Sequence, residues 1–194
     1  DRSAGHVVLS TGDALPYDKL ALCTGARPRR LPTPGADLAG VFYLRTAADG
    51  EMIREAAGPG RRAVIVGGGY IGLETAASLR ALGLEVTLLE ATGRVLERVT
   101  APEVSEFFDR IHREEGVNIR TGTLVEALSG DGRVREVILA GGESIPADLV
   151  IVGIGVEPNT ELAATAGLVV DNGVVIDDRA RTSDPDIVAA GDCA

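Results

Sequence analysis

The chain has 194 residues, of which 45% are hydrophobic, and its 29 acidic side chains against 19 lysines and arginines give a formal net charge of −10. This composition is typical of a globular protein with a sizeable core, and the negative charge argues against nucleic acid and anionic membranes as partners. No apolar run reaches the length of a membrane-spanning helix. Cys23 and Cys193 are too few for a disulfide framework or a zinc site, so we expect a cytoplasmic protein without a bound metal.

The first half of the chain begins with short apolar runs separated by turn residues. These runs predict strands at residues 6–9, 14–17 and 19–23, followed by a proline-rich connector at 28–34. Residues 41–45 are expected to form a strand or a linker. A helix is expected at 46–57, with Thr46 as its N-cap.

A segment near the start of the chain recurs further on. Residues 9–28 (LSTGDALPYDKLALCTGARP) align without a gap with residues 139–158 (LAGGESIPADLVIVGIGVEP), at a constant offset of 130. Gly12 meets Gly142 and Pro16 meets Pro146 in this alignment. Such internal similarity indicates two copies of one structural unit. Because the second copy closes a complete βαβ pattern, we expect the first to close an equivalent pattern whose glycine loop lies before residue 1.

That βαβ pattern occupies residues 61–90, RRAVIVGGGYIGLETAASLRALGLEVTLLE. Gly67, Gly69 and Gly72 form G-x-G-x-x-G where the strand at 63–66 turns into a helix. In this motif the first glycine permits the turn, the second admits a pyrophosphate, and the third lets the helix pack closely; the helix N-terminus faces the phosphates. Glu90 ends the next strand, where an acid accepts hydrogen bonds from an adenosine ribose. The pattern predicts a dinucleotide-binding site.

The acid at position 90 favours NADH over NADPH. Its carboxylate can accept hydrogen bonds from both ribose hydroxyls, whereas a 2′-phosphate in the same place would meet like charge, at a cost of about 4 kcal/mol at 4 Å and an effective dielectric of 20. Arg94 favours the opposite choice, because an arginine there could bind that phosphate. With Glu90 at the strand end, we expect NADH.

The rest of the chain continues the α/β pattern. Thr100 and Glu103 are spaced as a capping box, with Pro102 in the first turn of the helix that follows. This helix is expected to end at Gly116 and to bury an apolar stripe formed by Val104, Phe107, Phe108 and Ile111. The remaining expected elements are strands at 117–120, 123–128, 134–139, 149–152, 174–176 and 187–190, and a short helix at 161–166.

Three signatures occur in order: YDKLALCTGARPR (17–29), VGGGYIGLE (66–74) and TSDPDIVAAGDCA (182–194). Together they resemble the flavoproteins with two dinucleotide-binding domains, which hold FAD in one Rossmann-like lobe and NAD(P)H in the other. The run LLEATGRVLERVTAPEVSEFFDRIHREEGVNIRTGT (88–123) further resembles the ferredoxin reductases of the putidaredoxin and rhodocoxin reductase type. The resemblance implies an α/β fold in which a Rossmann-like three-layer NADH-binding lobe (41–159) is inserted into a partial FAD-binding lobe of the same type (1–40 and 160–194).

The resemblance also implies roles for individual residues. Asp192 would lie on the FAD ribitol, Arg45 beside the flavin nucleotide, and Thr24 and Gly25 next to FAD at a strand end. In the other lobe, Tyr70 would gate the nicotinamide pocket and Glu74 would approach the nicotinamide carboxamide. The full set of expected cofactor-binding residues is Gly67, Gly69, Tyr70, Ile71, Gly72, Glu74, Glu90, Arg94, Ile154 and Gly155 for NADH, and Thr24, Gly25, Arg45 and Asp192 for FAD.

The implied chemistry is hydride transfer from NADH to FAD, followed by single-electron transfer to a [2Fe–2S] ferredoxin that serves a P450 or Rieske oxygenase. No side chain needs to act as a nucleophile or a general base. Two alternatives stay open: a disulfide reductase or NADH oxidase or peroxidase of the same superfamily, and an NAD-binding module without catalysis. Neither cysteine has a cysteine neighbour, which disfavours a C-x-x-C reductase. We expect this chain by itself to retain FAD weakly or not at all.

Overall fold

A computed structural model describes all residues from Asp1 to Ala194. The chain forms two compact units, one made of Asp1–Arg27 with Val156–Ala194 and the other of Pro28–Gly155. We refer to them as the split unit and the central unit. The central unit has the larger core.

A five-stranded parallel sheet organises the central unit. Its spatial order is β5-β12-β6-β7-β8, and every neighbouring pair is parallel. The strands are β5 (Val41–Tyr43), β6 (Arg62–Val66), β7 (Glu85–Leu89), β8 (Asn118–Arg120) and β12 (Leu149–Val152). The chain runs outward from β6 to β7 and β8 and then returns to β12 on the other side of β6. In open α/β sheets, ligands bind beyond the carboxyl ends of the strands at such a change of direction.

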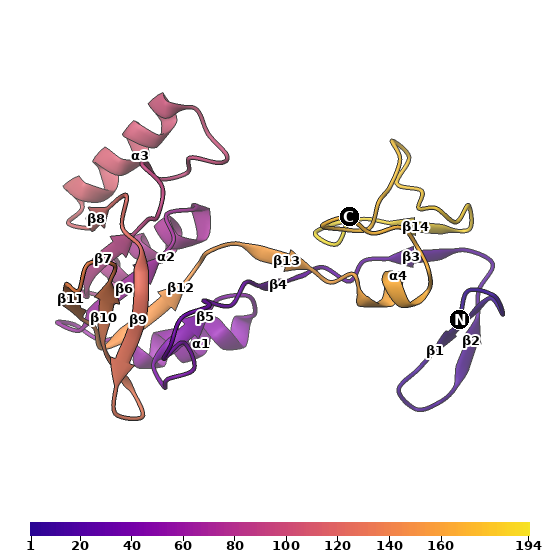
Figure 1. Ribbon diagram of the computed structural model, residues 1–194, viewed down its shortest axis with the longest axis horizontal. Helices are drawn as coiled ribbons and strands as arrows, with labels where there is room; N and C mark the ends of the chain where they lie inside the picture. Colours follow the sequence, from indigo (N-terminus) through magenta and orange to yellow (C-terminus); the bar gives the residue numbers. More distant parts are fainter. The chain divides into compact units, whose positions relative to one another are not determined.

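Alternating side chains of this sheet fill two different cores, as the two-residue period of a strand requires. On one face, Ile65, Leu88 and Ile151 pack against the helices α1 (Ala47–Ala56) and α2 (Tyr70–Ala81). On the other face, Val66 and Val152 pack against an antiparallel sheet made of β9 (Val125–Gly130), β10 (Val134–Leu139) and β11 (Ser144–Pro146). Helix α3 (Pro102–Glu114) connects β7 to β8 and contacts β8 and α2 (Figure 1). The central unit is therefore the expected three-layer α/β fold.

The split unit is built from shorter elements. A hairpin joins β1 (His6–Val8) to β2 (Ala14–Pro16), and β3 (Leu20–Leu22) pairs in parallel with β14 (Ile187–Ala189). Two further strands, β4 (Ala26–Pro28) and β13 (Val156–Pro158), pair with each other, and α4 (Glu161–Thr165) follows. A small core forms around Leu168, Val174 and Ile187.

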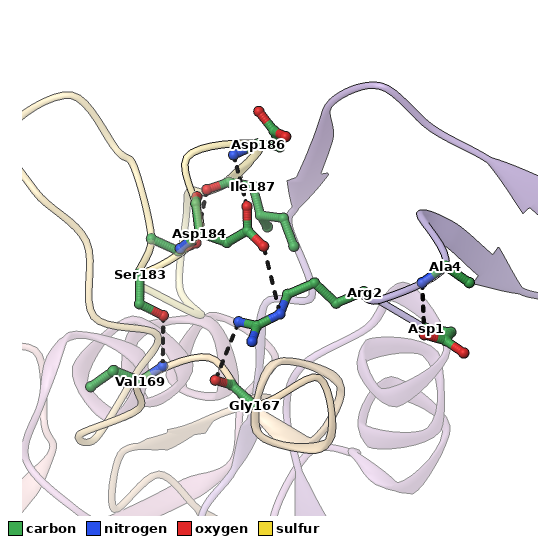
Figure 2. Close-up of polar contacts among 10 residues, drawn as sticks. Asp1, Arg2, Ala4, Gly167, Val169, Ser183, Asp184, Asp186 and Ile187 are labelled. Carbon is green, nitrogen blue, oxygen red and sulfur yellow. Dashed lines mark hydrogen bonds and ion pairs between the residues drawn. The ribbon is translucent and has the colours of Figure 1, made fainter.

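Polar contacts join the first residues of the split unit to its last third (Figure 2). The Arg2 guanidinium donates to the Gly167 carbonyl at 3.4 Å and forms an ion pair with Asp184 at 3.6 Å. Asp184 in turn accepts from the Asp186 amide at 2.9 Å. Because most of these groups are solvated, we expect this network to contribute only modestly to the stability of the split unit.

The structure confirms the internal repeat at the level of individual residue pairs. In the hairpin β1–β2, His6 pairs with Pro16 and Val8 with Ala14; in β10–β11, Glu136 pairs with Pro146 and Ile138 with Ser144, each 130 residues further on. The turns also correspond, because Gly12 and Gly142 both have positive φ, +91° and +88°. The two copies of the repeat therefore share one fold. This fold includes the strands β11, β4 and β13, which the pattern of apolar residues alone did not predict.

Of the two expected helix caps, the one at Thr46 is present and the one at Thr100 is not. Thr46 caps α1 as predicted: its hydroxyl accepts from the Asp49 amide while the Asp49 carboxylate accepts from the Thr46 amide at 2.7 Å. The capping box at Thr100 is wrong, because α3 is preceded by Ala101 and has no side-chain cap. The Thr100 hydroxyl instead donates to the Leu96 carbonyl at 3.1 Å, which turns it into the preceding loop.

The apolar stripe of α3 is also only partly buried. Val104 and Phe107 remain 40% and 49% exposed, whereas Ser105 and His112 are buried. The Ser105 hydroxyl donates to the Val95 carbonyl at 2.6 Å. This bond fixes which side of the helix faces the sheet, and it turns two of the four apolar side chains outward.

The compact units divide the chain at residues 27/28 and 155/156, whereas the sequence-based boundaries were 40/41 and 159/160. Residues 28–40 join the central unit because Leu31 lies in its second core and Gly35 lies against the Leu128 backbone. Asn159 joins the split unit, where its side chain donates to the Thr24 carbonyl at 2.9 Å.

We expect stability to fall below neutral pH because of His112. Burial lowers the pKa of the His112 imidazole, and the Asp109 carboxylate offsets part of this effect. The unfolded chain therefore takes up this proton first, and stability is lost as the pH falls below about 6.5, by at most about 1.4 kcal/mol per pH unit. Urea unfolding of His112→Leu should show a smaller loss between pH 7.5 and 5.5 than the unsubstituted protein. His6→Gln serves as the control and should retain the full loss, and equal losses in all three proteins would contradict the assignment.

Candidate dinucleotide-binding site

In the glycine turn between β6 and α2, the main chain of the helix packs closely against the main chain of the strand end. A methyl group on Gly72 would lie 2.0 Å from the Gly67 carbonyl oxygen, and one on Gly67 would lie 2.3 Å from the Gly153 carbonyl oxygen. Gly67 also has φ of +113°, which disfavours any side chain. These two glycines are therefore required by the fold itself, since they let α2 start directly at the end of β6.

Gly69 differs from its neighbours, because a methyl group there would meet no protein atom within 4 Å. Its φ of −80° is accessible to any residue. It precedes the first turn of α2, whose N-terminal N–H groups have no acceptor within the helix. Nothing inside the protein requires glycine at this position, so the open space beside it is suited to an external group such as a phosphate.

The Glu90 carboxylate binds the glycine turn. Its Oε2 accepts from the Gly68 amide at 2.6 Å, and its Oε1 accepts from the amide and the hydroxyl of Thr92 at 2.8 and 2.9 Å. A carboxylate accepts about four hydrogen bonds, so three positions are already used. One acceptor position of the carboxylate remains for a ribose hydroxyl. Hydrogen bonds to both ribose hydroxyls, as expected from the sequence, would require one of the two hydrogen bonds from Thr92 to break.

Arg94 lies in the loop that follows β7. Its guanidinium donates to the carbonyls of Thr100 and Glu97, each at 3.0 Å, and to the Ser105 hydroxyl at 2.5 Å. Three of its five N–H donors therefore brace the loop against the start of α3. This arrangement leaves little capacity for the 2′-phosphate that the sequence suggested as its ligand.

The backbone after β12 lies on the other side of the glycine turn. The Gly153 amide donates to the Val66 carbonyl at 2.8 Å, which continues the parallel ladder to the end of β6. Ile154 packs on the second core, and Gly155 has φ of +105°. The structure thus brings Ile154 and Gly155 to the same edge of the sheet as the glycine turn and Glu90.

Two large residues in the first turn of α2 are exposed, whereas Leu73 is buried. Tyr70 and Ile71 are 49% and 41% exposed, although both are large. Glu74 is also exposed, one turn further along α2. The sequence placed Glu74 in an apolar stretch, and the structure shows that it lies on the solvent side of the helix within this unit.

Four expected residues lie away from the glycine turn. Arg45 belongs to the central unit, two residues beyond β5 at the same carboxyl edge. Thr24, Gly25 and Asp192 belong to the split unit, where they follow the carboxyl ends of the paired parallel strands β3 and β14.

Within the split unit, Thr24 and Gly25 surround Cys193. Burial alone would raise the pKa of the Cys193 thiol, but hydrogen bonds from the Thr24 hydroxyl and from the Thr24 and Gly25 amides hold that pKa below its ordinary value. Cys23 is exposed, and neither cysteine forms a disulfide.

Comparison with known proteins assigns the chain to a family. The profile described as pyridine nucleotide-disulphide oxidoreductase matches residues 1–194, which is the whole chain. The chain belongs to this family. Its members include a putidaredoxin reductase of Pseudomonas putida, 52% identical over 200 residues that cover all of this chain and 47% of the relative.

Two other curated relatives are also similar along nearly the whole chain. A rhodocoxin reductase of Rhodococcus erythropolis is 48% identical over the whole chain and 46% of its own length, and a rubredoxin-NAD(+) reductase of Pseudomonas putida is 43% identical over 97% of the chain and 49% of its own length. Among solved structures, a covalent putidaredoxin reductase–putidaredoxin complex matches with a TM-score of 0.95 at 51% identity, covering 100% of this chain and 48% of the reductase. The chain spans about half the length of the curated relatives it matches.

Sequence reasoning missed two residues that support the glycine turn. A methyl group on Gly68 would crowd Glu90 and Val95, because it would lie 3.0 Å from Glu90 Oε2 and 3.1 Å from Val95. Thr92 holds the other oxygen of the same carboxylate. The run of three consecutive glycines was a signal for Gly68, whereas nothing in the sequence distinguished Thr92 from an ordinary loop threonine.

A hollow of about 910 Å³ lies elsewhere in the central unit, lined by Arg61, Arg62, Arg133, Arg135, Asp148 and neighbouring residues. Arg62 begins β6 and Asp148 precedes β12, so this hollow lies at the amino ends of the strands, away from the glycine turn. No group of side chains in the chain is arranged to hold a metal ion. None of the helices combines the length and the apolar character needed to cross a membrane.

Two glycine substitutions should distinguish the glycine that the fold requires, Gly72, from the glycine beside open space, Gly69. Gly72→Ala should cost about 3 kcal/mol of unfolding free energy, because its methyl group collides with the Gly67 carbonyl. Gly69→Ala should cost less than about 1 kcal/mol, since its methyl group has free space and only the helix cap changes. Urea unfolding measures both, and a larger cost for Gly69→Ala than for Gly72→Ala would contradict this description of the turn.

Proposed function

We propose that this chain is the NADH-binding part, with a portion of the FAD-binding part, of an NADH-dependent ferredoxin reductase. The observation that carries the proposal is the open space beside Gly69, at the N-terminus of α2, in the turn whose Gly68 amide donates to the Glu90 carboxylate. A dinucleotide placed there would set its pyrophosphate against free N–H groups and its adenosine ribose against a carboxylate.

The residues of the split unit fit an FAD group. Thr24, Gly25 and Asp192 follow two paired parallel strands, and flavin nucleotides bind at such carboxyl edges in doubly wound sheets. When bound, FAD would accept a hydride from NADH and release electrons one at a time. The side chains of this chain would bind and orient the two nucleotides, and none of them needs to react.

A [2Fe–2S] ferredoxin is the proposed electron acceptor, in support of a P450 or Rieske oxygenase. The proposal is supported by the similarity to putidaredoxin reductase along the whole chain. The 43% identity to a rubredoxin-NAD(+) reductase favours rubredoxin as the second candidate. A dithiol reductase is less favoured, because Cys23 is exposed, Cys193 is buried, and the two do not pair.

The acceptor can be tested in the full-length reductase that contains this chain. With NADH as donor, we expect reduction of a [2Fe–2S] ferredoxin at least tenfold faster, by kcat/KM, than reduction of rubredoxin or of a small disulfide. The assay follows the absorbance of each iron protein under anaerobic conditions. Faster reduction of rubredoxin would replace the ferredoxin proposal, and NADH consumption with oxygen as the only productive acceptor would refute both.

The choice of NADH should depend on the charge at position 90. We expect kcat/KM for NADH to exceed that for NADPH by at least tenfold, since a 2′-phosphate would meet the Glu90 carboxylate. Glu90→Gln should reduce this ratio about tenfold because it removes the repulsion while keeping an acceptor oxygen. Glu85→Gln, at the other end of β7, is the control and should leave the ratio unchanged. A preference for NADPH in the unsubstituted enzyme would show that the assignment is wrong.

A further inference from the structure

The loop of residues 91–100, between β7 and α3, is fixed firmly over the glycine turn. The Leu96 amide donates to the Gly68 carbonyl at 2.9 Å, and the Leu96 side chain is only 3% exposed. Leu96 also has φ of +55°, a conformation that costs a non-glycine residue on the order of 1 kcal/mol or more. The Arg94 guanidinium braces the same loop from inside. The backbone around position 98 therefore has a defined place at the carboxyl edge.

Arg98 extends from this loop toward the backbone after β12. Its Nη2 lies 3.7 Å from the point where a methyl group on Gly155 would be. The loop that carries Arg98 follows β7, whereas Gly155 follows β12, and β6 with its glycine turn lies between these strands in the sheet. The Arg98 side chain thus spans the carboxyl edge in front of the glycine turn, at the point where the sheet changes direction.

The two arginines of the loop differ in their use of donors. Arg94 is engaged with carbonyls and a hydroxyl, whereas Arg98 is exposed and its guanidinium forms no hydrogen bond or ion pair with the chain. The Arg98 guanidinium and the N-terminus of α2 both lie at the carboxyl edge of the sheet, so a full positive charge adds to the partial charge of the helix there. Together they are suited to a group with two adjacent negative charges.

We infer that Arg98 binds the pyrophosphate of the nicotinamide dinucleotide and closes the phosphate site from the side opposite α2. The inference rests on the proposed dinucleotide site and adds a residue to it. Because the pyrophosphate is common to NADH and NADPH, Arg98 contributes affinity without selecting between them. Glu90, which accepts from the Gly68 amide at the end of β7, makes that selection.

The test measures binding in the full-length reductase without any electron acceptor, using NADH, NADPH, ADP-ribose and adenosine as probes in calorimetric titrations. Arg98→Gln should weaken NADH, NADPH and ADP-ribose by the same factor, about tenfold, as expected for the loss of a charge-assisted hydrogen bond. Adenosine, which has no phosphate, should bind equally to both proteins. Arg98→Lys should recover part of the affinity, because it keeps the charge and loses the planar fork.

Arg135→Gln is the matched control: it removes an exposed arginine of β10 and should leave all four affinities unchanged. NADH affinity within twofold of the unsubstituted enzyme in Arg98→Gln, with an unaltered unfolding midpoint, would overturn the inference. Loss of NADPH affinity alone would also overturn it, because it would place Arg98 at the 2′-phosphate. If the enzyme binds NADH but fails to reduce a ferredoxin, the proposed function is wrong and these binding ratios still decide the role of Arg98.

Discussion

The arrangement of the central unit depends on the contact between the backbones of Gly67 and Gly72. A carbon atom on Gly72 would lie 2.0 Å from the Gly67 carbonyl oxygen, so only the absence of a side chain lets α2 begin at the end of β6. The same approach sets Gly67 against the Gly153 carbonyl, which fixes β12 and the backbone after it beside the turn. The helix N-terminus is thereby placed at the one position in the sheet where the chain changes direction.

The Glu90 carboxylate supports this turn and also belongs to the proposed dinucleotide site. It accepts from the Gly68 amide and from the amide and the hydroxyl of Thr92, and the hydroxyl also lies within hydrogen-bond distance of the Arg94 carbonyl, at 3.0 Å. One acceptor position of the carboxylate remains for the ribose of the proposed dinucleotide. In that proposal, one side chain would hold the glycine turn in shape before the dinucleotide binds and would then contribute to its recognition, which reduces the ordering that binding must supply.

Much of this fold is readable from the sequence, because its signals are local. The buried runs of β6, β7 and β12 have the period of strands, and the 130-residue repeat specifies the register of two hairpins that short strands alone do not reveal. The site residues Gly67, Gly72 and Glu90 follow from motif spacing. The predicted capping box is wrong because the Thr100 hydroxyl donates to the Leu96 carbonyl instead of capping α3. In the same loop at 91–100, Arg94 donates to the carbonyls of Thr100 and Glu97, contacts that its position in the sequence does not indicate. The contrast between Arg94 and Arg98 depends on that loop's three-dimensional path, which no spacing rule describes.

Amide hydrogen exchange of the full-length reductase, with and without NADH, tests the central claim most directly. The account predicts slower exchange at the two segments that flank the change of direction, residues 66–74 and 152–156, with little change around Arg133 and Arg135 at the opposite edge of the sheet. Protection centred on that opposite edge, with residues 66–74 unaffected, would contradict the assignment of the glycine turn as the nucleotide site.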